Sequence, residues 1–545
     1  MSVFFGTPDS KRVLKSLQSL FISDAPPRII LSADEKKLLS HAADYIQTKT
    51  AGDAPGNAET KFRAIAIVHM YVMHRGSISG KTVNVIAYAC IVIASKIEGG
   101  RFKIRKDEEK QAEATILEYI DYNPALPTPY QIILTALHSM GKEDDAAVRK
   151  ECQDAMYVLA HKSPEMCLSC TSVVQADAVL FSVMGKCDAV KSDASLLLPA
   201  ALVIIENTEN HPAKGSVAEI KQKVGLFTFE MKQMDPVETL PHKNRFLVDF
   251  ELEEGALGEG TFGTVHVGRR KSDGRRFAVK KQKDVSEMGF NESFLVEIAT
   301  LKTIPKHPNI VELVDVYNDD TIYIVYELLG VRLRDYMKRN GRGMQNVDIM
   351  HKIACGVAFL HSYGHVHRDL KPDNVLVGKG RTTKIADFGS ADFDPMYPRT
   401  MKRAGSMRYR APEILSNQYA DEGVDIWAMA CVFYEIAHGK PLFEKPKSAK
   451  DQSEEYRLMM KNIKNVLGGT LPGFSETPEK SNLRIRLEGN DFNLLLGRML
   501  DYDKNTRITA YEVLESPVFS AFGNPDATTS REQEAIRHTK RRRMD

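Results

Sequence analysis

The sequence predicts two unlike folds in one chain, an all-α N-terminal half followed by an α+β domain. Apolar residues recur at spacings of three and four from about residue 34 to residue 224, as in amphipathic helices. After residue 246 the pattern changes to short alternating runs, which are typical of strands in a small antiparallel sheet. From about residue 347 the helical spacing returns. A chain of 545 residues has room for several folding units.

Composition excludes some classes of function. The formal net charge of +2 gives no strong field, so we expect neither nucleic acid nor a membrane as a partner. The first residues lack an apolar signal core, and no apolar run reaches the roughly 18 residues that span a membrane. Seven scattered cysteines indicate reduced thiols and a location in the nucleus and/or cytoplasm. Cys167 and Cys170 form one close pair, which we interpret as structural rather than metal-binding.

Helices are expected in the N-terminal half wherever apolar positions follow the helical period. Several of these segments are apolar on more than one face, which is typical of central helices in a bundle. They are residues 62–74, 83–98, 114–120 and 195–207. Residues 232–246 contain two prolines and little periodicity, so they read as a linker.

Four runs after the linker predict strands: FLVDFELEEGALG, TVHVGRR, RRFAVKKQ and TIYIVYELL. The chain from Gly523 onward is polar and ends in a basic run, residues 540–543. Such a run is usually a solvated end, and a nuclear-import signal is the alternative interpretation.

A glycine-rich motif, Gly258-Glu-Gly260-Thr-Phe-Gly263-Thr-Val265, lies between two predicted strands. In the dinucleotide-binding motif a helix would follow, so the two flanking strands favour a different phosphate-binding loop. Glycines let the backbone approach phosphate oxygens without a Cβ in the way. The motif taken alone is equally compatible with an ordinary glycine turn.

Lys280 ends the apolar strand that follows this loop, in the segment Phe277-Ala278-Val279-Lys280. A lysine at a strand end can simply extend to the surface. Glu297 lies on the next predicted helix, where Leu301 and Lys302 give that helix one apolar and one polar face.

The most informative stretch is His367-Arg-Asp-Leu-Lys-Pro-Asp-Asn374, followed thirteen residues later by Asp387-Phe-Gly389. Phosphoryl transfer needs positioned charge rather than covalent chemistry from the protein. Asp369 is the candidate base, and Lys371 would lie beside the γ-phosphate. Asn374 and Asp387 offer hard oxygen ligands suited to Mg²⁺.

These motifs together resemble the eukaryotic protein kinases over some 270 residues. Ala411-Pro-Glu413, Asp425, Trp427 and Arg507 follow at matching spacings, and the resemblance implies a buried ion pair between Glu413 and Arg507. It also implies that Lys280 reaches the α- and β-phosphates and is held by Glu297. The resemblance implies ATP and Mg²⁺ as cofactors, with ATP bound by Leu257, Gly258, Glu259, Gly260, Thr261, Phe262, Gly263, Thr264, Val265, Ala278, Lys280, Glu327 and Leu329.

Within that family the sequence is most similar to the cyclin-dependent kinases. The similarity rests on GEGTFGTV, HRDLKPDN, the segment Tyr409–Glu413, and an insert-like stretch ending LGGTLPGF at residues 467–474. In the family, the arginine matching Arg410 shapes the pocket after the acceptor residue and favours proline there. The resemblance therefore implies proline-directed phosphorylation of serine or threonine in protein substrates.

Three departures from this family concern regulation. The helix that binds cyclin keeps only its glutamate clearly, in the stretch Glu292–Glu297. The inhibitory tyrosine of the glycine loop is replaced by Phe262, although Thr261 remains available. Thr400 is one residue away from the position of the activating threonine, where Met401 stands. Phosphorylated Thr400 could still pair with Arg368, and Ser406 matches a hydroxyl residue that bonds near the catalytic aspartate.

The N-terminal half resembles the cyclin fold. In cyclins, a lysine and a glutamate at the positions of Lys96 and Glu113 hold the partner kinase near its glutamate-bearing helix. A proline-containing break at residues 126–129 falls where the first cyclin repeat passes to the second. Two repeats of five helices are therefore expected, and an unrelated helical bundle is the alternative.

Fusion of a kinase to its activator suggests docking within one chain. Covalent linkage would raise the effective concentration to roughly the millimolar range, and a linker of 15 residues reaches about 50 Å. Two alternatives remain: a kinase-like scaffold that binds partners, or a cyclin module that regulates other kinases in trans. The expected segments are an N-terminal extension (1–33), two cyclin-like repeats (34–126 and 127–231), a linker (232–246), a kinase domain (247–522) and a basic tail (523–545).

Overall fold

The structure is a computed structural model of the chain. The described residues are 28–31, 33–51, 57–75, 78–98, 102, 104, 106–120, 128–139, 142, 145–164, 167, 172–184, 201, 204, 207, 231–233, 246–260, 263–283, 291–319, 321–393, 405–416, 421–446, 449–468 and 490–522. They divide into two compact units. The first contains Met1–Arg275, Val279–Ala299 and Asp315–Ile324, and the second contains Arg276–Ala278, Thr300–Val314 and Val325–Asp545.

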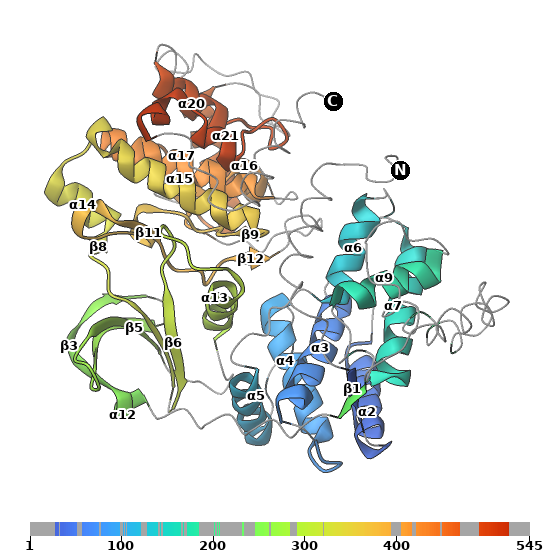
Figure 1. Ribbon diagram of the computed structural model, residues 1–545. Helices are drawn as coiled ribbons and strands as arrows, with labels where there is room; N and C mark the ends of the chain where they lie inside the picture. The colour runs from blue at the N-terminus through green and yellow to red at the C-terminus, as the bar shows by residue number, and fades with distance from the viewer. Residues whose placement is uncertain are drawn as a thin grey trace. The chain divides into compact units, whose positions relative to one another are not determined.

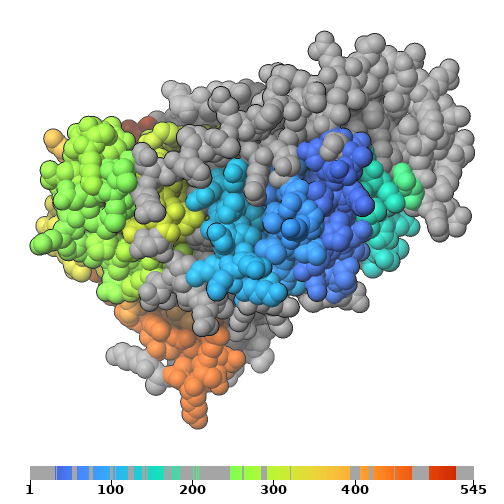
Figure 2. All heavy atoms as spheres, turned by 90° about the horizontal axis from the view of Figure 1, so that it is seen from below, coloured from blue at the N-terminus to red at the C-terminus, as the bar shows by residue number. Residues whose placement is uncertain are grey.

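The N-terminal half is helical, as the periodicity predicts (Figure 1). Helix α4 (Val83–Glu98) packs against α2, α3 and α5, and its residues Ala87 and Ala89–Ala94 are completely buried. Figure 2 shows the blue atoms of these early helices next to one another on one face. The surrounding helices are α2 (Ala33–Lys49), α3 (Asn57–Arg75), α5 (Asp107–Tyr119), α6 (Pro129–Ser139), α7 (Ala146–Lys162) and α9 (Ser172–Met184).

The helices expected at 62–74, 83–98 and 114–120 are confirmed. Most of the helix expected at 195–207 lies outside the described residues. Among the residues that are described, four helices fall within 34–126 or at its edge and three within 127–231, so the expected five per repeat stay a prediction. Two short parallel strands, β1 (Arg28–Ile30) and β2 (Met231–Gln233), were not predicted. Their pairing joins the end of the expected extension to the start of the expected linker.

A five-stranded sheet follows, in the order β3-β4-β5-β7-β6. The predicted runs supply four of its strands, and β6 is a strand that the sequence patterns did not reveal. The strands are β3 (Phe250–Glu259), β4 (Gly263–Arg270), β5 (Arg276–Gln282), β6 (Leu313–Asn318) and β7 (Ile322–Glu327).

The strand expected to begin at Phe246 is wrong for its first four residues. Residues Phe246–Asp249 form the short helix α12, because a helical turn places Phe246 and Phe250 on one side. Their rings stack with centroids 5.3 Å apart, and Phe246 also stacks on Tyr323 at 4.1 Å. The backbone N–H of Phe246 donates to Asp319 Oδ2 at 2.6 Å.

Helix α13 (Glu292–Thr303) packs against the sheet through the buried ring of Phe294, which lies beside Gly263. Asn291 precedes it, and its side chain accepts from the N–H of Ser293 at 2.9 Å, as an N-cap does. This start fixes the helix so that Glu297 faces β5.

The second unit is built on two buried helices, α15 (Val347–Ser362) and α17 (Gly423–His438). Trp427 of α17 is completely buried and stacks on Phe443. Smaller helices surround them: α14 (Leu333–Asn340), α16 (Pro412–Leu415), α18 (Gln452–Leu467), α20 (Asp491–Met499) and α21 (Ala510–Leu514), with 3₁₀ segments at Met344–Asn346, Pro372–Asn374, Lys379–Arg381, Met407–Tyr409 and Pro517–Phe522.

Two small sheets hold the loops of this unit. Strand β10 (Val375–Val377) pairs with β11 (Thr383–Ile385) and with β8 (Val331–Arg332). Strand β9 (His365–Val366) pairs antiparallel with β12 (Asp392–Phe393), with Asp392 opposite Val366.

Among the helices that the structure describes, none is long and apolar enough to cross a membrane.

Candidate active site

The glycine-rich motif forms the tip of the β3–β4 hairpin, between two strands as predicted. Gly258 pairs with Val265 and Glu259 with Thr264, and Gly260 N–H donates to Gly263 C=O at 2.9 Å. A Cβ on Gly263 would lie 2.6 Å from the carbonyl oxygen of Lys281, so only glycine fits there. The expected ATP contacts Thr261 and Phe262 lie outside the described residues.

Lys280 and Glu297 are brought together by β5 and α13. The Lys280 ammonium donates to Glu297 Oε2 at 2.6 Å, and the side chains are 16% and 2% exposed. Phe277 and Val279 are buried on one face of β5, so Ala278 and Lys280 share the opposite face. A fixed ammonium on that face can bind a phosphate.

Two further expected ATP contacts lie at the end of β7, where Glu327 is the last residue of the strand and Leu329 comes two residues later. The Glu327 carboxylate is engaged within the protein, because it accepts from Lys384 at 2.6 Å and from the N–H of Glu312 at 2.8 Å. Leu329 lies beside Gly378. Leu257, another expected ATP contact, is 55% exposed.

Asp369 is held by three donors. Its Oδ1 accepts from the backbone N–H of Ser406 at 2.8 Å, and its Oδ2 accepts from Lys371 at 2.5 Å and from Asn374 at 3.2 Å. Lys371 also donates to the hydroxyl of Ser406 at 3.0 Å. The carboxylate is therefore fixed in orientation by donors from three residues.

Asp425, completely buried on α17, holds the backbone of the two residues before Asp369. Its carboxylate accepts from the N–H groups of His367 and Arg368 at 2.7 and 2.8 Å, and from His361 Nε2 at 3.1 Å. Burial alone would raise the pKa of Asp425, but the hydrogen bonds and charges of His361 and His367 outweigh it and lower the pKa. An ionised carboxylate therefore holds the segment before Asp369.

Asn374 and Asp387 fit a hard cation. The Asn374 amide nitrogen donates to the carbonyl oxygen of Asp369 at 2.9 Å and to its carboxylate, so the amide oxygen is directed elsewhere. The N–H of Ala386 donates to the carbonyl oxygen of Asn374 at 2.9 Å, which joins the segment before Asp387 to the Asn374 segment. Asp387 adopts φ 65°, a strained backbone angle for a residue with a Cβ. Oxygen donors of this kind suit Mg²⁺.

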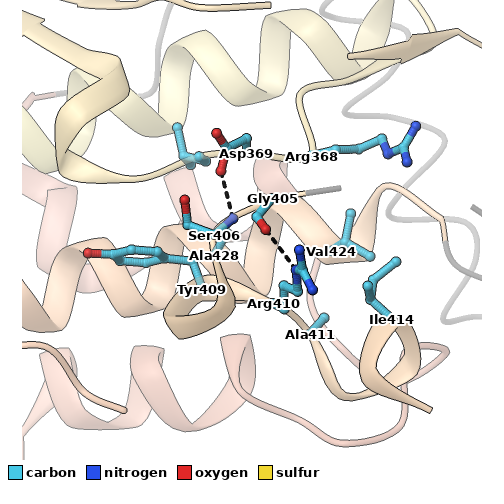
Figure 3. A pocket seen from close by; sticks show the side chains of 11 residues that line it. Arg368, Asp369, Gly405, Ser406, Tyr409, Arg410, Ala411, Ile414, Val424 and Ala428 are labelled. Carbon is cyan, nitrogen blue, oxygen red and sulfur yellow. Dashed lines mark hydrogen bonds between the residues drawn. The ribbon is translucent and has the colours of Figure 1, made fainter. Parts of the chain in front are cut away.

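A pocket adjoins Asp369 on the side of Ser406 and Arg410 (Figure 3). Arg410 Nε donates to the carbonyl oxygen of Gly405 at 2.7 Å, and its NH1 donates to Tyr456 Oη at 2.7 Å. Gly405 has φ 85°, and a Cβ there would lie 2.4 Å from the carbonyl oxygen of Arg368. Glycine therefore permits the turn in which the carbonyl of Gly405 faces Arg410.

Behind the pocket, Arg334 of α14 joins three segments. Its guanidinium donates to both oxygens of Asp373 at 2.8–3.0 Å, to Glu435 at 3.2 Å and to Tyr409 Oη at 3.3 Å. Burial and the neighbouring Glu435 raise the pKa of Tyr409, so its hydroxyl remains a donor to Glu435 at 2.8 Å. Arg334 thus links the catalytic loop to the segment that carries Arg410.

The expected ion pair between Glu413 and Arg507 is present and bidentate, with N–O distances of 2.6 and 3.0 Å. The Arg507 side chain is completely buried and lies over Trp427. The pair fixes α16 to the segment just before α21.

Of the expected regulatory residues, Thr400 lies outside the described residues, as does Met401. Arg368, expected to receive a phosphate, forms an ion pair with Asp392, NH1 to Oδ2 at 2.8 Å. Motif reasoning missed Asp392, Gly405 and Arg334. The sequence signal for Asp392 is a carboxylate three residues after Gly389, and the signal for Gly405 is a glycine directly before Ser406.

In the helical half, Lys96 of α4 and Glu113 of α5 form an ion pair at 2.5 Å, with side chains 12% and 0% exposed. Burial lowers the pKa of Lys96, against the opposing effects of Glu113 and Glu292. Asn318 on β6 donates to Glu118 of α5 at 3.2 Å. Both contacts lie within the first compact unit.

Comparison with known proteins agrees with this geometry. The family described as "Protein kinase domain" matches residues 252–519. The chain is 30% identical to "Cyclin-dependent kinase B2-1" of Oryza sativa subsp. japonica over 286 residues, which cover 48% of this chain and 88% of the relative. It is 34% identical to "Cell division control protein 2 homolog 3" of Trypanosoma brucei brucei over 282 residues, 48% of this chain and 90% of that protein. The chain belongs to the protein kinase family, with cyclin-dependent kinases among its relatives.

Proposed function

We propose that this chain is an ATP- and Mg²⁺-dependent kinase that phosphorylates serine or threonine residues followed by proline. The observation that carries the proposal is the Asp369 carboxylate, held by Ser406, Lys371 and Asn374 beside the pocket of Gly405 and Arg410. A fixed acceptor beside a recess lined by Ser406 and Arg410 suits the transfer of a phosphoryl group to a side-chain hydroxyl.

Each polar group has a role in this proposal. Asp369 would accept the proton of the substrate hydroxyl, and Lys371, held at 2.5 Å from it, would place positive charge at the transferred phosphoryl group. Lys280 would bind the phosphates of ATP, kept in place by Glu297. Asn374 and Asp387 would hold Mg²⁺, which neutralises phosphate charge when bound.

The proposed preference for proline rests on the hydrogen bond that the carbonyl oxygen of Gly405 accepts from Arg410. Because the carbonyl oxygen of Gly405 already accepts from Arg410, it is not available to a substrate N–H. A residue with an N–H at the position after the acceptor would leave that donor unpaired, at a cost of about 1–3 kcal/mol. Proline has no N–H and avoids this cost.

A peptide assay tests the activity and the preference together. Purified full-length protein with ATP and Mg²⁺ is given matched peptides that contain Ser-Pro, Ser-Ala or Tyr-Pro. We expect phosphate transfer to Ser-Pro, a lower rate on Ser-Ala, and none on Tyr-Pro. Absence of transfer to every peptide would instead favour the scaffold alternative.

We further propose that the helical half is a cyclin-like activator acting within the same chain. Support comes from the first compact unit, where Lys96 interacts electrostatically with Glu292, the first residue of the helix that carries Glu297. The hydrogen bond from Asn318 to Glu118 also connects the helical half to the sheet. Contacts at both places would hold α13 so that the pair between Lys280 and Glu297 persists.

Separation of the halves tests this second proposal. Full-length protein should phosphorylate the Ser-Pro peptide unaided, whereas residues 240–545 alone should be much slower. Addition of residues 1–235 as a separate protein should restore part of the rate. Equal activity of the full-length and shortened proteins would rule out activation in cis.

A further inference from the structure

Arg368 has an acidic partner on a neighbouring strand. Its side chain is 6% exposed, and its NH1 lies 2.8 Å from Oδ2 of Asp392, whose side chain is 30% exposed. The strand register explains the contact, since Asp392 pairs with Val366 and Arg368 is two residues farther along. Diagonal neighbours in antiparallel strands are within reach of long side chains.

The backbone of Arg368 contacts the buried Asp425 of α17 and the glycine of the pocket. Its N–H donates to Asp425 at 2.8 Å, and its carbonyl oxygen closely approaches Gly405. It directly precedes Asp369 and adopts φ 66°, a strained angle that its surroundings must maintain. A shift at Arg368 would therefore move the base and the substrate pocket together.

The side chains of Arg368 and Asp369 point away from each other, as Figure 3 shows. The guanidinium thus lies apart from the reacting atoms and acts through the position of the backbone. A guanidinium as buried as this one needs a counter-charge, because leaving it unpaired would cost several kcal/mol. In protein kinases generally, a phosphorylated activation segment supplies such a charge through a phosphate–arginine pair.

We propose that Asp392 is a built-in counter-ion for Arg368 and replaces the activating phosphate, so that activity does not depend on phosphorylation of the activation segment. Asp392 is then a positioning residue for the phosphoryl transfer. This inference rests on the proposed kinase function. A carboxylate carries one negative charge, which suffices for one guanidinium, whereas a phosphate carries about 1.5 to 2.

The alternative is that Asp392 holds the place until a phosphate displaces it. The structure favours the permanent partner for two reasons. Asp392 belongs to β12, and the pairing of β12 with β9 keeps its backbone beside Arg368. A phosphate that approached Arg368 would also meet the like charge of Asp392, which weakens its binding.

The test compares phosphorylated and dephosphorylated full-length protein. One portion is incubated with ATP and Mg²⁺, a second is treated with a broad phosphatase, and mass spectrometry reports the phosphate on Thr400 and its neighbours. After removal of the phosphatase, kcat and KM are measured on the Ser-Pro peptide. We expect the two portions, and a Thr400→Ala variant, to agree within about twofold in kcat.

Substitutions of Asp392 provide a second, independent measurement. We expect Asp392→Asn to lower kcat at least about tenfold with little change in KM for ATP, because the base is misplaced while the nucleotide site is intact. Asp392→Glu, which keeps the charge, should restore most of kcat. Asp335→Asn removes a carboxylate of an exposed pair with Lys338 on α14 and is the matched control, expected to behave as wild type.

The outcomes separate two kinds of failure. A fall of about tenfold or more on phosphatase treatment, or wild-type kcat in Asp392→Asn, overturns the built-in counter-ion. If Asp392→Asn does not fold, the comparison of the two wild-type portions decides alone. If untreated wild type transfers no phosphate to any peptide, the proposed kinase function has failed and the inference falls with it.

Discussion

Lys280 and Glu297 lie 17 residues apart in sequence and are joined by an ion pair at 2.6 Å in which the carboxylate is almost fully buried. The pair depends on two elements, since β5 presents the lysine and the capped start of α13 presents the glutamate. Lys280 also lies 5.1 Å from the ring centroid of Phe294, which packs α13 on the sheet. The position of α13 therefore controls the position of the Lys280 ammonium.

Replacement of these two residues should affect catalysis unequally. Lys280→Met removes the cation, so we expect kcat on the Ser-Pro peptide to fall by about 10²–10³. Glu297→Gln keeps the cation but loosens it, so a loss of about tenfold is expected. Lys306→Met, at a surface lysine that is 80% exposed, is the control. A Lys280→Met enzyme with normal kcat would contradict the assigned role.

Asp369→Asn should show whether the protein acts as an enzyme or as a scaffold. The amide keeps the size of the side chain but cannot accept a proton, so kcat should fall by about 10²–10⁴. Binding of a Ser-Pro peptide, followed by fluorescence anisotropy, should change little because the pocket of Gly405 and Arg410 is intact. If the variant transferred phosphate at the wild-type rate, Asp369 would not be the base.

Arg410→Lys tests the origin of the proline preference. A lysine has one nitrogen in place of the guanidinium fork, so it cannot reproduce the two separate donors, Nε and NH1, that reach the Gly405 carbonyl and Tyr456. The ratio of kcat/KM for Ser-Pro over Ser-Ala peptides should fall by about tenfold or more. Arg408→Lys, at an exposed pair with Glu444, is the matched control. An unchanged ratio in Arg410→Lys would mean that another contact selects proline.

Glu413→Gln should lower stability rather than alter specificity. The substitution leaves the completely buried guanidinium of Arg507 without its counter-charge, which costs about 3–5 kcal/mol. Urea unfolding of the full-length protein, followed by the fluorescence of the single tryptophan, Trp427, reports this region. Glu444→Gln breaks an exposed pair and should change the unfolding free energy by less than about 1 kcal/mol. Equal midpoints for the two variants would refute the prediction.

The sequence predicted the parts of the site that depend on local motifs. Glycine positions, a lysine at a strand end and two acidic loops occur at spacings that narrow the choice to phosphoryl transfer. Helix periods likewise predicted α3 and α4, because their apolar faces are long. The short helix α12 was misread as a strand, since four residues cannot distinguish the two periods.

Other features could not be predicted, because they depend on contacts between segments distant in sequence. The pair of Arg368 with Asp392 requires the register of β9 and β12, two strands of two residues each. Arg334 reaches Glu435 across 101 residues of sequence, and neither residue belongs to a motif. The positive φ of Gly405 depends on its contact with Arg368. Composition and periodicity describe local sequence, so they cannot predict these contacts.

The buried His69 of α3 predicts acid sensitivity of the helical half. Burial lowers the pKa of His69 from 6.5 to about 4. Between these two pH values the unfolded chain binds a proton that the folded chain does not, so stability falls as pH falls. The contribution is fully present above pH 6.5, and about 2 kcal/mol of it should be lost at pH 5.

Hydrogen exchange of the α3 amides measures this effect locally. Rates at pH 7.5 and pH 5, corrected for intrinsic exchange, give the opening free energy at each pH. His69→Leu cannot titrate, so the decrease between the two pH values should be smaller by about 2 kcal/mol than in wild type. His41→Leu, at an exposed histidine of α2, should keep the wild-type decrease. If His69→Leu kept it as well, another group would be responsible for the loss of stability in acid.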